Sequence, residues 1–431
     1  MSKFDYSAID TQQCNRIYRF ISQLKYDEIP PATRRYAALL LLDTLGVYIV
    51  AHPLEASRIA RLTALKLFGP SAHSSMPLMF DHNVTSAAGF AFAGATQIDN
   101  LDAHDGFAPA KGHIGAALVP VILALTYPHK NQISGKDLIQ SLIIGYEIAS
   151  RAGCAIHATC HDYHTSGAWN VLGCIAAASY LKNLCFDATR QAFGIGEYHA
   201  PRSQMMREIT HPTMLHDGSS MGACGAIMAV EMAEKGFQGA PSLLIEGKNA
   251  HAFWQDLKQI WYTNQQYIKP YPICRWAHAP IDGAIELRQR YQLKIEDIKR
   301  VDIYTFDEGI RLYHKMPAST AQAQYSLHFS LAKALQYGHI GIDEITGDAL
   351  SCKVTENMIT RIYAHHEPRH QKRFPEGRWA HIEITLNDGR LLKSGDIDAK
   401  GGKDTPLSQD EILDKFTRYA STQMTLKNTK K

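Results

Sequence analysis

The first 263 residues carry apolar side chains at the three- and four-residue spacing of helices, and few stretches alternate with the two-residue period of strands. A small-residue run, AAGFAFAGA, lies within residues 84–97, where small side chains would let neighbouring helix backbones approach closely. We therefore expect a helical bundle with this helix at its centre. The expected helices cover residues 15–24, 31–51, 56–68, 84–97, 136–158, 166–181, 187–195 and 219–235.

The pattern changes after Pro270. Residues 300–306 alternate and are β-branched, and residues 378–386 and 391–397 flank Asn387-Asp388-Gly389, a strong hairpin signal. Helices are expected over 281–291, 321–337 and, after Ser408, in a last helix. The predicted fold is mainly α. A large all-helical domain comprises residues 1–264 and 400–431, and a smaller α+β lid domain comprises residues 265–399.

Composition excludes several classes of protein. The chain of 431 residues is 45% hydrophobic and 20% charged, so it can bury a sizeable core. A net charge of +3 does not suggest a nucleic-acid partner. The most apolar window, residues 36–51, is too short to span a bilayer, and no secretory signal is evident. Eight dispersed cysteines then indicate reduced thiols and a cytoplasmic protein without a membrane partner.

The richest polar stretch runs from Ile98 to Leu125, where one expected helix ends and an apolar helix begins. It brings together the ionisable side chains Asp99, Asp102, His104, Asp105, Lys111 and His113. His113 falls at or just before the first turn of the new helix, and the partial positive charge there favours a neutral imidazole. Such a ring can accept a proton from a substrate near neutral pH. We therefore expect this junction to be the floor of an active site.

Two metal sites are conceivable from spacing alone. Asp99, Asp102 and Asp105 could bind a hard cation, or the magnesium diphosphate of a helical prenyl-transfer enzyme, but the second aspartate-rich cluster that such enzymes need is missing. His157, His161 and His164 fall on one helical stripe and could bind zinc. We favour His164 alone as a site residue, because the next helix begins beside it.

A serine hydrolase is the other alternative. Residues 218–222, GSSMG, match the G-x-S-x-G pattern and would make Ser220 the nucleophile. The polar segment before it, THPTMLHD, does not resemble the buried strand that a nucleophile elbow requires. Lys269 and Arg275 lie at the expected domain boundary and could bind carboxylates in a cleft. No phosphate-binding glycine motif is present, so a nucleotide cofactor has no support.

At these residues the chain resembles the MmgE/PrpD family. The resemblance covers most of the chain and is carried by AGATQIDNLDAHD, GHIGAALVPVILAL, GYEIASRAG, YHTSGAWNVLGCIAAAS, LHDGSSMGACGAIMAVEMAEKGFQGA, KPYPICRWAH and FPEGR. It implies a large helical domain with a smaller α+β lid, a homodimer, and no metal or organic cofactor. It also implies a lyase or isomerase acting on a small di- or tricarboxylate, by dehydration, decarboxylation or epimerisation.

The resemblance further implies site residues. Asp99, His113, His164 and Lys269 match positions that line the pocket of the family's cis-aconitate decarboxylases. Thr213 and Phe329 stand where those enzymes have a pocket lysine and tyrosine, which leaves the substrate open.

Roles follow from these matches as a hypothesis. His113 takes or returns the proton next to a carboxylate, Asp99 and His104 orient it or supply a second proton, and His164 is the acid. The substrate's carboxylates would be bound by Lys269, Arg275, Arg202, His216 and Asp102.

Overall fold

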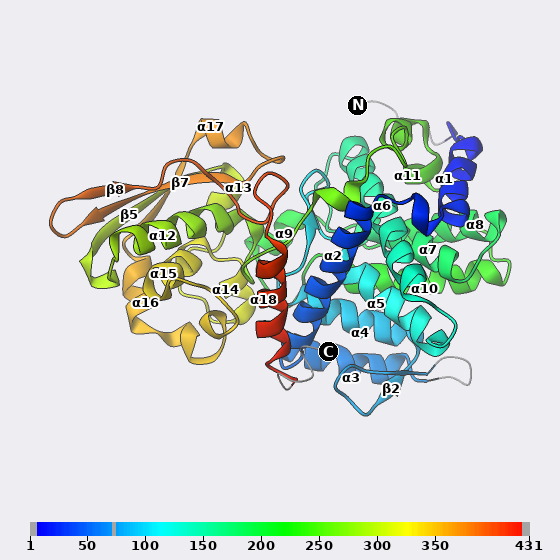
Figure 1. The fold of residues 1–431 in the computed structure, drawn as a ribbon, viewed down its shortest axis with the longest axis horizontal. Helices are drawn as coiled ribbons and strands as arrows, with labels where there is room; N and C mark the ends of the chain where they lie inside the picture. Colours follow the sequence, from blue (N-terminus) through cyan, green and yellow to red (C-terminus); the bar gives the residue numbers. More distant parts are fainter. Residues whose placement is uncertain (1–6, 71–74, 425–431) are drawn as a thin grey trace.

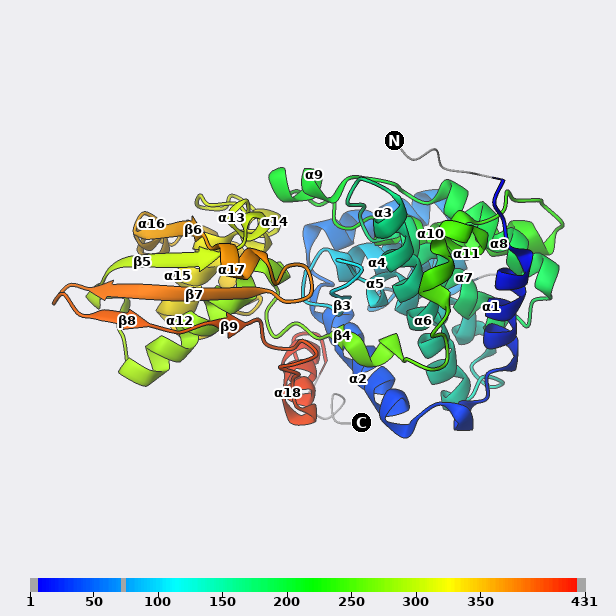
Figure 2. The same cartoon turned by 90° about the horizontal axis from the view of Figure 1, so that it is seen from above.

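The computed structural model describes residues 7–70 and 75–424. Figure 1 shows a helical bundle on one side and a sheet with its own helices on the other. Figure 2, seen from above, places the short strands β3 (Gly106–Phe107) and β4 (Gln266–Tyr267) between these two parts, where they pair antiparallel. The architecture is thus mainly α with a smaller α+β domain, as predicted. The limits of the two domains stay a prediction.

The bundle consists of helices that follow one another along the chain. They are α1 (Thr11–Gln23), α2 (Pro31–Val50), α3 (Glu55–Leu67), α4 (Ala87–Asp99), α5 (Gly115–Thr126), α6 (Gly135–Thr159), α7 (Gly167–Leu181), α8 (Phe186–His199), α9 (Met205–Thr210), α10 (Ser219–Glu234) and α11 (Leu243–Glu246). The small strands β1 (Met76–Pro77) and β2 (Val84–Thr85) pair beside α3. Most bounds lie within a few residues of those expected.

Small residues set the spacing in the centre of the bundle. A Cβ at Gly145 of α6 would lie 2.4 Å from Leu118 of α5, and one at Gly173 of α7 would lie 2.4 Å from the Gly145 carbonyl oxygen. A side chain at either glycine would therefore push α6 away from its neighbours. At its start, α6 is held by a capping box between Ser134 and Asp137.

The lid contains a five-stranded sheet of strands β5 (Ile298–Thr305), β6 (Ile362–His366), β7 (Trp379–Leu386), β8 (Leu391–Lys393) and β9 (Ile397–Asp398). The order is β6-β5-β7-β8, with β9 also paired to β7. Only β5 and β6 run parallel. The lid helices are α12 (His278–Tyr291), α13 (Asp307–Ile310), α14 (Thr320–Gln324), α15 (Leu327–Tyr337), α16 (Lys353–Ile359) and α17 (Pro368–Gln371).

The prediction of one continuous helix over residues 321–337 is wrong, because the segment forms two helices, α14 and α15, with a short interruption between them. The Ser326 hydroxyl accepts the Phe329 N–H and caps the new helix. The break leaves Tyr325 outside both helices, with its hydroxyl bonded to Glu208 of α9. The interruption thus coincides with a contact between residues 117 positions apart.

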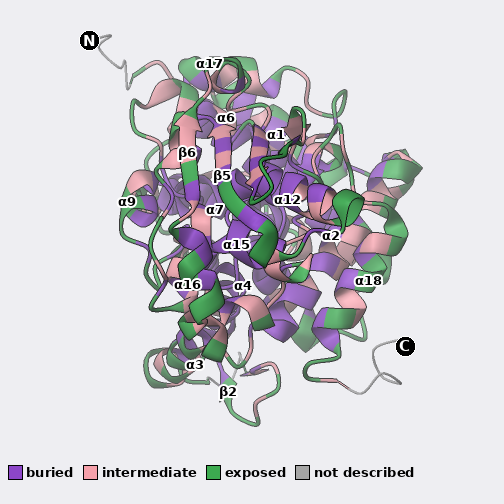
Figure 3. Cartoon of the chain, turned by 90° about the vertical axis from the view of Figure 1, so that its left-hand side faces the viewer, coloured by how far each residue is buried: buried purple, intermediate pink, exposed green. Residues whose placement is uncertain are grey.

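The last helix, α18 (Gln409–Ala420), returns from the lid and packs on α2 (Figure 1). Lys415 of α18 and Asp43 of α2, both buried, form an ion pair of 2.6 Å. Seen from the lid side, buried residues gather in the middle of the molecule and exposed ones around it (Figure 3).

Two further observations bear on the expected cellular setting. Within the described residues, no helix is by itself long and apolar enough to cross a membrane, and Pro31–Val50 with Glu55–Leu67 passes only as a pair bent by 91°. The eight cysteines, all within the described residues, are free thiols.

Candidate active site

A buried polar cluster forms where the bundle meets the lid. The bundle contributes the end of α4, the loop before α5, and residues 208–219; the lid contributes Tyr267, Lys269 and the break at Tyr325. Every ionisable side chain in the core of this cluster is less than a tenth exposed. Charges and proton positions there are consequently set by neighbours and not by water.

His113 lies just before α5, in a fixed orientation. Its backbone N–H donates to the Ser166 hydroxyl at 2.9 Å, and its ring Nδ1 lies 2.6 Å from the carbonyl oxygen of Asp105. A carbonyl oxygen can only accept, so Nδ1 carries a proton and donates it to this hydrogen bond. Nε2 faces the carboxylates of Asp217 at 3.6 Å and Asp102 at 4.0 Å.

His104 packs edge-on against the His113 ring, with ring centres 4.5 Å apart. Burial lowers the pKa of His104 far below its ordinary value, and the nearby His113 and Lys269 lower it further. Its Nε2 lies 3.6 Å from Asp99, whose other oxygen accepts the Ser219 N–H at 3.1 Å. Burial, and then the negative charge of Asp217, raise the pKa of Asp99 well above its usual value. Asp99 therefore holds its proton more tightly than an exposed aspartic acid does.

Asp102 differs from Asp99, because it has a cation beside it. Lys269, which is fully buried, forms an ion pair with the Asp102 carboxylate. Burial alone would raise the pKa of Asp102, but Lys269 and then His113 outweigh it and hold the pKa below its usual value. The Asp102 N–H donates to Gln324 of the lid at 2.8 Å. This pair ties the bundle to the lid.

Asp217 connects the remaining groups. Its carboxylate accepts the Ser166 hydroxyl at 2.5 Å, and its N–H donates to Glu208 at 2.7 Å. Burial and the Asp217 charge raise the pKa of Glu208 well above its usual value, and its other oxygen accepts the Tyr325 hydroxyl. Glu208 is thus a second carboxyl group with a raised pKa in this cluster.

A cavity of about 530 Å³ opens on this cluster. Its polar wall includes Asp99, Glu208, His216 and Asp217, and Arg207 lies at its exposed side. Both ring nitrogens of His216 are buried without a hydrogen-bond partner among the described residues. The cavity could hold a small organic acid, and His216 offers such a ligand an unused polar group. His113 does not itself line the cavity and lies directly behind Asp217.

Three residues predicted from the sequence, Arg275, Arg202 and His164, lie outside the cluster or are bound to other groups. Arg275 donates to the carbonyl oxygens of Ala399 and Lys400 and stacks on Tyr267, so it holds the chain that leads to α18. Arg202 lies 3.3 Å from Glu197 on another cavity.

The His164 ring forms no hydrogen bond or ion pair with the cluster in the part of the chain that is described, although Thr165 lines the cavity. The structure thus brings together Asp99, Asp102, His104, His113, His216 and Lys269.

Several groups were missed by sequence reasoning. Asp217, Glu208, Arg207 and Tyr325 carried no local signal of a site, because they join it only through tertiary contacts. Phe329, where a pocket tyrosine was expected, is fully buried in α15.

The structure does not support two alternatives that residue spacing had suggested, the metal site of three aspartates and the nucleophile elbow at Ser220. The three aspartates have different partners: Ser219 for Asp99, Lys269 for Asp102 and the Gly115 N–H for Asp105. The segment before Ser220 forms no strand among the described residues, so the nucleophile elbow is missing.

The chain was compared with known proteins. The MmgE/PrpD N-terminal domain matches residues 15–256 and the MmgE/PrpD C-terminal domain matches residues 271–431. The mouse cis-aconitate decarboxylase is 24% identical over 93% of this chain and 85% of its own length. The human cis-aconitate decarboxylase is also 24% identical, over 93% and 86%, and that of Aspergillus terreus is 22% identical, over 94% and 88%.

Proposed function

The chain belongs to the MmgE/PrpD family, and from that premise we propose that it is a lyase or isomerase of small di- or tricarboxylates. The reaction moves a proton at a carbon next to a carboxylate. Because the curated relatives are cis-aconitate decarboxylases, loss of carbon dioxide from a tricarboxylate is the first reaction to test. No metal or organic cofactor takes part in this proposal.

The observation that carries the proposal is the fixed orientation of the His113 ring. Its Nδ1 donates to the Asp105 carbonyl oxygen, and this hydrogen bond directs Nε2 toward Asp102 and Asp217. An imidazole held by a backbone carbonyl can exchange a proton at Nε2 without reorienting. In the proposed reaction the substrate occupies the cavity, and the Asp217 carboxylate, which lines the cavity, passes the proton between the substrate and His113.

Reprotonation needs an acid, and Asp99 and Glu208 are the proposed donors. Burial and the Asp217 charge raise the pKa of both groups, which favours their protonated forms. A protonated carboxyl can donate a hydrogen bond to a developing enolate and then return a proton.

The substrate's carboxylates need donors, for which we propose His216 and Arg207. His216 has two unused ring nitrogens in the cavity wall, and Arg207 forms no ion pair among the described residues. An arginine can bind a carboxylate through two parallel hydrogen bonds. We assign Lys269 a different role from the sequence hypothesis: it keeps Asp102 ionised behind His113.

A homodimer remains part of the proposal. Apolar side chains that line the cavity are exposed, at Met214, Leu215 and Met221, and a second copy would cover them.

The test is a substrate screen in heavy water. The purified protein is incubated with cis-aconitate, citrate, methylcitrate and amino-dicarboxylates, with and without chelator, and NMR follows deuterium uptake and product. We expect deuterium to enter one compound of this class next to a carboxylate, with or without chelator.

Two outcomes would contradict the proposal. Failure of every acid to exchange or to raise the melting temperature would reject it. Activity that is lost with chelator and restored by metal would favour the metal-dependent alternative.

A further inference from the structure

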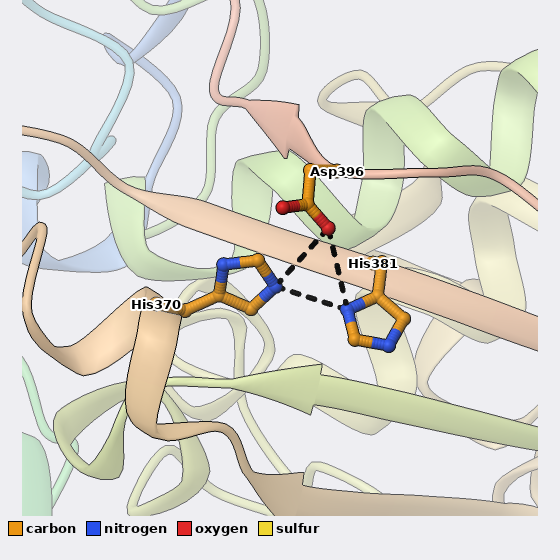
Figure 4. Close-up of side chains that lie close together, drawn as sticks. All are labelled: His370, His381 and Asp396. Carbon is orange, nitrogen blue, oxygen red and sulfur yellow. Dashed lines mark hydrogen bonds and ion pairs between the residues drawn. The ribbon is translucent and has the colours of Figure 1, made fainter.

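Three polar side chains converge on the lid, away from the cluster around His113. His370 belongs to α17, His381 to β7, and Asp396 precedes β9. Figure 4 shows the two rings and the carboxylate directed toward one another. Two imidazoles and one carboxylate are the ligand set of many zinc sites that keep a fourth position for water.

The separations fit a metal ion. His370 Nε2 and His381 Nδ1 are 3.0 Å apart, and each lies 3.8 Å from Asp396 Oδ1. In a triangle with these sides, the point equidistant from the corners lies about 2.1 Å from each atom, which equals the usual bond length from zinc to imidazole nitrogen or carboxylate oxygen.

Packing holds both rings in place. His370 is fully buried. The His381 ring is stacked on Tyr304 with centres 4.5 Å apart. Two ligands that are already positioned lose little conformational freedom when a metal binds.

A cationic side chain already uses these acceptors. Arg369 Nη2 lies 2.9 Å from Asp396 Oδ1 and 3.0 Å from His381 Nδ1. An arginine can only donate, so the His381 Nδ1 and Asp396 Oδ1 atoms are acceptors directed at one positive group. The Arg369 side chain is 52% exposed and can turn into water. Arg373, 3.7 Å from the other Asp396 oxygen, is also largely exposed, and Glu367 lies beside Arg369.

The geometry points to a zinc-binding site formed by His370, His381 and Asp396, with Arg369 as a competitor that zinc displaces. Zinc there joins α17, β7 and the segment before β9 and stabilises the lid. The site shares no residue with the cluster around His113, so it stands or falls independently of the proposed reaction.

The experiment measures zinc binding to the full-length protein, made without a histidine tag and first treated with chelator. Equilibrium dialysis against zinc chloride gives the stoichiometry and affinity. Cobalt(II) then reports the geometry, because four-coordinate sites give intense visible bands. We expect one zinc per chain, a four-coordinate cobalt spectrum and a higher melting temperature with zinc.

Four variants make the test specific. His381→Gln and Asp396→Asn should weaken zinc binding by more than about 100-fold, since even residues outside the ligand shell are worth about 10–100-fold. Arg369→Gln should tighten binding, because the competing cation is gone. His366→Gln is the matched control: it removes an exposed lid histidine that pairs with Asp307 at 2.7 Å, and it should bind zinc like wild type.

Either of two results would overturn the inference. One is equal zinc binding by wild type and His381→Gln. The other is binding by Arg369→Gln alone, which would mean that the guanidinium occupies the site permanently.

Discussion

At the scale of single residues, the site depends on carboxyl groups with different proton affinities close together. Asp99 and Glu208 have raised pKa values, and Asp102 has a lowered one. The difference comes from partners, because all three are buried and only Asp102 has a cation in contact. Pairs of acids pushed apart in this way can divide the roles of proton donor and ionised group.

The raised pKa of Asp99 has a cost in stability that depends on pH. Above about pH 3.9 the unfolded chain releases this proton while the folded chain keeps it, so stability falls as pH rises toward the folded-state pKa. Asp99→Asn keeps an acceptor for the Ser219 N–H and removes the titration. We expect the variant's melting temperature, relative to wild type, to be higher at pH 7 than at pH 4.

Asp302→Asn supplies a control of opposite sign. The partner Arg300 lowers the pKa of Asp302, so this carboxylate stabilises the fold above its unfolded pKa and the variant should lose stability at pH 7. The prediction for Asp99→Asn would be wrong if its melting temperature differed from that of wild type by the same amount at both pH values. That result would show that Asp99 is ionised in the folded protein.

At the scale of elements, the start of α5 positions His113, the proposed base. Asp105 accepts the Gly115 N–H through its carboxylate and holds His113 through its carbonyl oxygen. A Cβ at Gly115 would lie 2.2 Å from the Asp105 carboxylate and 2.7 Å from the Tyr146 hydroxyl. The glycine is therefore needed for the position of Asp105.

Gly115→Ala should lower kcat by about 10²-fold, because displacements near 1 Å in a catalytic group cost that much. Gly225→Ala in α10 is the matched control, since a Cβ there meets nothing within 4 Å. It should leave kcat unchanged and could stabilise the helix by up to about 1 kcal/mol. Equal kcat values in the two variants would separate Asp105 from catalysis.

The return of α18 to the bundle is a second element with a measurable role. Burial raises the pKa of Asp43 to about 6 even though Lys415 is in contact. Lys415→Met would leave this carboxyl buried without its partner, and losing one member of a buried pair costs about 3–5 kcal/mol.

The measurement for Lys415→Met is urea unfolding. Lys400→Met, which removes the exposed bridge to Glu411, should cost less than about 1 kcal/mol. If both variants lost the same free energy of unfolding, the ion pair between Lys415 and Asp43 would contribute little to the docking of α18.

Most helices were predictable, because a helix records its buried face every three or four residues. The strand predicted over residues 378–386 was equally clear from its sequence pattern, and it matches β7. The break between α14 and α15 was not predicted, because helical spacing of apolar residues continues across it. The contact of Tyr325 with Glu208 joins residues far apart in the sequence, and such a contact leaves no trace in the local pattern.

At the scale of the whole molecule, the site exists only because the lid closes on the bundle. Gln324 binds the Asp102 backbone, Tyr325 binds Glu208, and Lys269 binds Asp102. The sequence could group His113 with its acidic neighbours, because they fall within one loop. It could not supply Asp217, Glu208 or Arg207, which reach the site through folding alone.

The central claim is that His113 moves a proton of a small carboxylate substrate where bundle and lid meet. Its most direct test is solvent deuterium exchange into the substrate found by the screen, measured for wild type and His113→Ala. A positioned base is typically worth about 10²–10⁴ in rate, so exchange in the variant should fall by at least about 10²-fold with the melting temperature nearly unchanged. Exchange within a few-fold of wild type would contradict the account.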